Sequence, residues 1–104
     1  MDEREAEEVR KQLIERLGCF EAHRITTFRA FRNEKNGPAV QEITVEVLDA
    51  GPGTATRYHV KAGDQFGRVA SGNARESLRD ALIGVHWYDL DKPRPEIIDP
   101  EETA

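Results

Sequence analysis

Apolar and polar positions follow two different periods along this chain, and each period indicates a different kind of element. Over residues 3–17 the apolar positions recur every three or four residues, as in a helix with one apolar stripe. The stripe consists of Ala6, Val9, Leu13 and Leu17. Over residues 40–49, apolar Ile43, Val45 and Val47 alternate with polar neighbours, which predicts a strand with one buried face.

Three other segments are predicted to form strands. Residues 23–33 are rich in β-branched and aromatic types, although their alternation leaves the register open. Residues 56–62 place Tyr58 and Val60 on one face, and residues 67–71 indicate a short last strand. Residue types that favour turns separate the strands: Asn36-Gly37-Pro38, Gly51-Pro52-Gly53 and Gly63-Asp64. The pattern is compatible with three strands or with four.

A second amphipathic helix is predicted after the last strand. Asn73 is expected to be its N-cap, and Glu76 three residues later completes a capping box. The apolar stripe of this helix consists of Leu78, Ala81, Leu82 and Val85. We expect the helix to end near Trp87, because the sequence then becomes acidic and contains prolines.

These elements predict a small α+β domain. The order is helix, three or four antiparallel strands, helix, and each helix has a single apolar stripe. The economical packing places both helices on one face of the sheet and leaves the other face in water. We expect one domain over residues 1–88. Residues 89–104, which contain three prolines and six acidic residues, are expected to be a disordered tail.

The composition disfavours several classes of protein. The chain has 104 residues and one cysteine, Cys19, so it cannot form an intrachain disulfide and a reducing, cytoplasmic setting is expected. Its charged first residues do not resemble a secretory signal, and no apolar run reaches the about 20 residues of a membrane helix. The net charge is −5, with the acidity gathered at the two ends, which argues against a general binder of phosphate backbones.

Two short segments resemble the double-stranded-RNA-binding domain, a family with the order α-β-β-β-α. One segment is Gly37-Pro38 followed by the strand around Ile43–Val47, and the other is Gly67–Gly72 leading into Ala74-Arg75. The resemblance implies this fold. It also implies contacts with RNA phosphates through lysines at the start of the second helix.

The start of the second predicted helix departs from that family. It has Arg75 and Arg79 in place of clustered lysines, with Glu76 and Asp80 beside them. The two arginines and the helix N-terminus are a candidate phosphate site, and local pairing with the two acids is the alternative. RNA affinity is therefore expected to be weak.

A second basic candidate lies on the outward face of the strand predicted over residues 56–62. Arg57, His59 and Lys61 share this face, where they would attract an anion or a nucleic acid. Cross-strand pairing with Glu42 and Glu46 is the alternative.

Candidate protein-binding residues lie near the C-terminal end of the chain. Trp87 and Tyr88 close the predicted domain, and Ile97 and Ile98 are an apolar pair in a polar tail. They would dock on a partner or add a strand to a sheet edge, unless they fold back onto their own domain. The stretch from Ala70 to Leu82 is also similar to the strand-to-helix corner of HicB-like antitoxins, which implies a toxin as partner.

The sequence predicts no enzyme, metal or cofactor. Cys19 and the histidines lack the spacing of zinc ligands, and the carboxylates show no recognisable catalytic spacing. We therefore predict a binding module that recognises a protein partner or itself, with no membrane association. Weak RNA binding and a HicB-like antitoxin are the alternatives.

Overall fold

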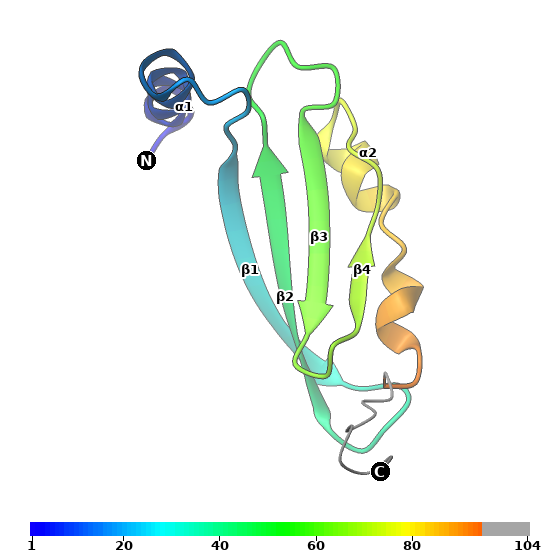
Figure 1. Ribbon diagram of the computed structural model, residues 1–104. Coiled ribbons are helices and arrows are strands. Elements are labelled where there is room, and N and C mark those ends of the chain that lie inside the picture. Colours follow the sequence, from blue (N-terminus) through cyan, green and yellow to red (C-terminus); the bar gives the residue numbers. More distant parts are fainter. Residues whose placement is uncertain (95–104) are drawn as a thin grey trace, which may run out of the picture.

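The structure, a computed structural model, describes residues 1–94 (Figure 1). The elements follow one another in this order: α1 (Glu3–Leu17), β1 (Arg24–Asn33), β2 (Val40–Asp49), β3 (Tyr58–Asp64), β4 (Val69–Ser71), α2 (Leu78–Ile83) and the 3-10 helix η1 (Trp87–Asp91). The predicted α+β class is confirmed, and the sheet has four antiparallel strands.

The strands lie in the sheet in the order of the chain, β1-β2-β3-β4, so each is joined to the next by a hairpin. Phe28 lies opposite Val45, Val45 opposite Ala62, and Ala62 opposite Ala70. Residues directly opposite one another share a face, and we call this side the apolar face. This pairing sets the register of β1, which the sequence left open.

The hydrophobic core lies between the apolar face of β3 and β4 and the helices α2 and η1. Its buried residues are Val60, Ala62, Ala70, Ala81, Val85 and Leu90. The backbones also approach closely, because a Cβ added to Gly72 would lie 2.5 Å from the carbonyl oxygen of Gly84. The helices cover only this half of the sheet, and the side chain of Phe28 on β1 is 56% exposed.

The N-terminal helix α1 does not cover the sheet. The Asp2 side chain caps it by accepting a hydrogen bond from the Glu5 backbone at 2.8 Å, and Gly18 ends it with a φ of 70°. None of the residues Glu3–Leu17 is buried. Figure 1 shows α1 beside the first residues of β1, because the short connection 18–23 leads directly from one to the other. The prediction that both helices pack on one face is therefore correct only for α2.

Helix α2 begins later than the sequence predicted. Its N-cap is Ser77, whose side chain accepts a hydrogen bond from the Asp80 backbone at 3.1 Å. Asn73 is not the cap, because the chain after β4 stays extended and Arg75 exchanges two backbone hydrogen bonds with Tyr58, of 2.8 and 2.9 Å. Backbone pairing with β3 thus displaces the expected capping box.

The folded part of the chain extends beyond residue 88, where the sequence placed the start of the tail. Residues 87–91 form η1, and Leu90 belongs to the buried core. Residues 89–94 are therefore part of the domain. Their side chains and carbonyls join the charged cluster described next.

Candidate functional site

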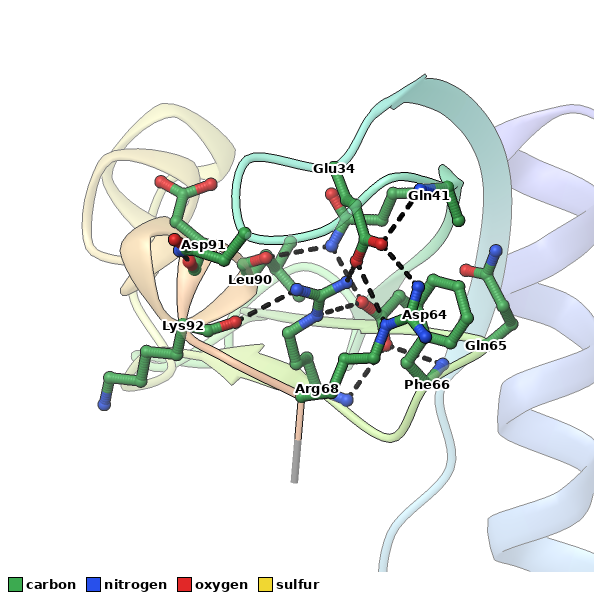
Figure 2. Close-up of polar contacts among 12 residues, drawn as sticks. Glu34, Gln41, Asp64, Gln65, Phe66, Arg68, Leu90, Asp91 and Lys92 are labelled. Carbon is green, nitrogen blue, oxygen red and sulfur yellow. Dashed lines mark hydrogen bonds and ion pairs between the residues drawn. The ribbon is translucent and has the colours of Figure 1, made fainter. Parts of the chain in front are cut away.

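The most buried charged side chains gather at the end of the sheet where β1 and β3 finish (Figure 2). Arg68 lies at the centre with a side chain that is 2% exposed. Its Nη2 donates to Glu34 Oε2 and its Nε donates to Asp64 Oδ2, each at 2.6 Å. Its Nη1 donates to the carbonyl of Lys92 at 3.0 Å. One guanidinium thus joins the β1–β2 turn, the end of β3 and the segment after η1.

Gln41 on β2 extends this cluster and is itself fully buried. Its amide nitrogen donates to Asp64 at 2.8 Å and to the carbonyl of Leu90 at 2.9 Å. Its amide oxygen accepts from Arg32 Nε at 2.6 Å, and Arg32 also pairs with Asp91. Both ends of the Gln41 amide are therefore occupied.

The carboxylates of the cluster are held in the ionised form. Hydrogen bonds from Arg94, the Ala39 backbone and Arg68 outweigh the cost of burial and lower the pKa of Glu34 to about 2. Burial opposes ionisation of Asp64, but hydrogen bonds from Gln41 and Arg68 lower its pKa. Neither group is poised to exchange a proton near neutral pH.

The cluster is therefore suited to holding segments together rather than to chemistry. In the part of the chain that the structure describes, every buried side-chain nitrogen or oxygen has a hydrogen-bond partner, so the buried polar atoms of the cluster are already occupied. Sequence reasoning missed this cluster, because Glu34, Asp64 and Arg94 are far apart in the chain. Of the ion pairs that Arg68 and Glu34 form, only that between Asp64 and Arg68 joins residues close in the sequence, four positions apart.

The structure does not give a common basic surface to Arg57, His59 and Lys61. Arg57 precedes β3 and pairs with Asp49 at 2.7 Å and with Glu3 at 2.8 Å, and these acids raise its pKa. His59 and Lys61 lie on the face opposite the core, where Lys61 is directly across from Glu46. Arg57 and Lys61 thus lie beside acidic residues, whereas His59 lies across from Leu48.

A hollow of ≈ 580 Å³ lies over this opposite face of the sheet. Its charged lining residues are Glu42, Glu46, Lys61 and Asp64. Glu42 is also bound by Arg29, at 3.0 Å. With three acids and one lysine, the lining does not favour an anionic ligand.

Arg75 and Arg79 are not one helical turn apart. Arg75 lies in the extended segment that pairs with Tyr58, and Arg79 lies in α2. The predicted phosphate site at a helix N-terminus is therefore wrong in its geometry. The extra backbone pairing that shortens α2 also separates the two arginines.

The structure describes two of the four predicted protein-binding residues, Trp87 and Tyr88. Trp87 is in η1 and its indole N–H donates to the carbonyl of Leu82 at 3.0 Å. Tyr88 is exposed and stacks on His86, with ring centroids 5.6 Å apart. Ile97 and Ile98 lie outside the described residues. Trp87 and Tyr88 remain candidates for contact with a partner.

Three elements or pairs of elements carry groups of exposed large apolar side chains. They are Ile25, Phe28 and Phe31 on β1, Val9, Leu13 and Leu17 on α1, and Leu78, Leu82, Ile83 and Trp87 around α2 and η1. The sequence predicted the apolar stripe of α1 but expected the sheet to bury it. Each of these groups is a candidate binding surface, because neighbouring exposed side chains of this size indicate contact with another molecule.

The described residues contain neither a metal site nor a membrane-spanning helix, and the chain matches no known protein. Among residues 1–94, no three His, Cys, Asp or Glu side chains lie together as ligands of a metal ion. None of the helices in this part of the chain is both long and apolar enough to cross a membrane. The chain matches no family model, no curated protein and no solved structure. A function must therefore be argued from the geometry alone.

Proposed function

We propose that this protein is a non-enzymatic module that binds another protein through the β1–β2 half of the apolar face of its sheet. One observation carries the proposal. Phe28 shares a face with the core residues Val60 and Ala62, yet no helix within residues 1–94 covers it. Burying such a side chain is worth about 1.5–3 kcal/mol, which a partner would gain by covering it.

The surface around Phe28 is continuous and apolar. Ala30 is next to Phe28 on the same face of β1, and they lie opposite Ile43 and Val45 of β2, which are partly buried against the core. A partner element with one apolar side would extend the core across this half of the sheet. Aromatic side chains at the centre of such a surface carry much of the binding energy.

The edge of the sheet supports the same proposal. Within residues 1–94, β1 pairs with β2 alone, so its ten residues have a second edge with backbone groups open to a partner strand. A partner strand added there would continue the apolar face beyond Phe28. The three arginines of β1 and its lack of acids favour a partner strand that carries carboxylates.

A non-enzymatic role is supported by the charged cluster around Arg68. Its buried groups are bound to one another, and the pKa of Glu34 lies far from neutral pH. Catalysis requires polar groups aimed at a shared space where a substrate can sit. The uncovered half of the apolar face is instead suited to binding.

The test compares two phenylalanines of the same strand. Phe28 and Phe31 are both exposed, but they lie on opposite faces of β1. The full chain and the variants F28R and F31R are used as bait, and a retained protein is purified and titrated by calorimetry. We expect F28R to weaken binding at least tenfold and F31R to weaken it much less. A partner with equal affinity for both variants would contradict the proposed surface.

A second arm of the test distinguishes RNA from protein. The resemblance to double-stranded-RNA-binding domains makes a short RNA duplex the appropriate probe. Amide NMR shifts at low salt that cluster at His59, Lys61, Arg75 and Arg79, and vanish as salt is raised, would overturn the proposal in favour of RNA binding. We expect no such cluster, because Glu46 lies across from Lys61, and Glu76 and Asp80 follow Arg75 and Arg79 in the chain.

A further inference from the structure

Three of the four residues of the α1 apolar stripe are exposed within the described chain. Val9 is 48% exposed, Leu13 is 36% exposed and Leu17 is 73% exposed. The fourth, Ala6, lies on the flank that faces the rest of the molecule, where Glu3 pairs with Arg57 and Arg10 lies against Gly51. A helix attached in this way leaves its apolar side available to a second molecule.

Charge is divided along α1. From Asp2 to Glu8 there are five acidic residues and one arginine, whereas from Arg10 to Arg16 there are three basic residues and one acidic residue. Two parallel copies of this helix would place like charges side by side. Two antiparallel copies would place the acidic half of each helix against the basic half of the other, with their dipoles opposed.

We propose that α1 is a self-association helix, which packs against α1 of a second copy of this chain in antiparallel orientation. The surface is separate from the β1–β2 face proposed above, so the two proposals are tested independently. A second copy is the occupant that matches both the apolar stripe and the division of charge.

The helical positions give the pair a definite register. If the antiparallel pair is centred on Lys11, Val9 lies level with Leu13 of the second copy. Glu5 then lies within one residue of the level of Arg16 of the second copy. At about 100° per residue, Glu5 and Arg16 are on the same flank of the stripe, and identical flanks face each other in an antiparallel pair. Both side chains are exposed, and within residues 1–94 neither forms an ion pair.

The first experiment is sedimentation equilibrium of the full chain from low micromolar to near-millimolar concentration at low salt. We expect a monomer–dimer equilibrium. We expect L13D, at a side chain that the monomer leaves partly exposed, to raise the dissociation constant at least tenfold. A strict monomer over the whole range would overturn the proposal, whatever the outcome of the tests on Phe28.

Charge reversal tests the register without altering the apolar stripe. E5K alone and R16E alone each place two like-charged pairs in an antiparallel homodimer, and we expect each to weaken self-association about 3- to 10-fold. The double variant E5K/R16E, and an equimolar mixture of the two single variants, are expected to restore it. A double variant as weak as the single variants would exclude the antiparallel pairing.

The single cysteine reports the orientation directly. Cys19 follows α1, so a spin label attached to it marks the C-terminal end of the helix. At 1.5 Å per residue, the antiparallel pair places the two labels about 25 Å apart, whereas a parallel pair places them within about 10 Å. A short distance measured by double electron–electron resonance would contradict the proposal.

Discussion

At the residue scale, the structure depends on a buried ionic cluster in which acidic and basic side chains neutralise one another's charge. Arg68 is held between Glu34 and Asp64, and all three side chains are almost completely removed from water. Transferring each charge out of water is costly, and only complete pairing offsets that cost. Such a cluster specifies one arrangement of the turns, because any other arrangement would leave a buried charge without a partner.

The first prediction concerns Arg68. R68M removes the central cation and leaves two buried carboxylates, so we expect it to lower the free energy of unfolding by about 3 kcal/mol or more. R29M is the matched control, since Arg29 pairs with Glu42 at the exposed surface; it should cost less than about 1 kcal/mol. Urea unfolding measures both, and equal losses would show that the cluster contributes no more than a surface pair.

The second prediction concerns acid. Arg94 and Arg68 lower the pKa of Glu34 from 4.5 to about 2 in the folded state. The ionised group therefore stabilises the fold above pH 4.5, and this contribution is lost as the pH falls from 4.5 towards 2. We expect the free energy of unfolding of E34Q to decrease less steeply over this window than that of the unmodified chain. Parallel curves from urea unfolding at several pH values would refute the assigned pairing.

At the element scale, α2 shows how tertiary pairing overrides a local signal. Asn73 and Glu76 have the spacing of a capping box. The chain nevertheless remains extended through Arg75, because the backbone of Arg75 pairs with Tyr58. The helix then starts at the next suitable cap, Ser77. A capping signal shows where a helix can begin, whereas competing backbone hydrogen bonds decide where it does.

The third prediction distinguishes the two caps. S77A removes the hydroxyl that accepts from the Asp80 backbone, so it should lower the stability of the protein by about 1 kcal/mol. N73A should change it by less than about 0.5 kcal/mol, because Asn73 is an exposed residue outside the helix. Thermal and urea unfolding of both variants provide the comparison. A larger loss for N73A would place the start of α2 where the sequence alone put it.

At the scale of the whole molecule, the core is asymmetric. The buried residues of the core cluster come from β3, β4 and the segment that runs from α2 through η1, whereas α1 and β1 contribute none. The half of the molecule with few buried contacts is therefore the half that presents Phe28 and the α1 stripe. A single module would thus combine a stable core with two surfaces suited to binding.

The fourth prediction follows from this asymmetry. In native-state hydrogen exchange at low micromolar concentration, we expect the amides of β3 to be the most protected and those of α1 to exchange much faster. Raising the protein concentration should protect α1 selectively, because self-association would cover its stripe. Equal protection of α1 and β3 in the monomer would show that the helix is anchored more firmly than its contacts indicate.

The candidate site could be predicted from the sequence only in its parts. The apolar stripe of α1 and the alternation of β2 are local patterns, and both were visible. The acidic partners of Arg57 could not be identified from the sequence, because Asp49 was assigned only to a strand and Glu3 only to a helix. The cluster around Arg68 was missed for the same reason, since Glu34 lies 34 residues away.

The sequence by itself determined the class and order of the elements, because hydrophobic period and turn residues act over a few neighbouring positions. It also determined which side of α1, β2 and β3 is apolar, but not which side of β1. Only the tertiary structure decided where those apolar sides lie, because strand register and backbone pairing are set between distant segments. It placed α2 and η1 over β3 and β4, and it left α1 and the outer half of the sheet uncovered. The proposed functions rest on these uncovered surfaces, since an apolar side that residues 1–94 do not bury is available to another chain.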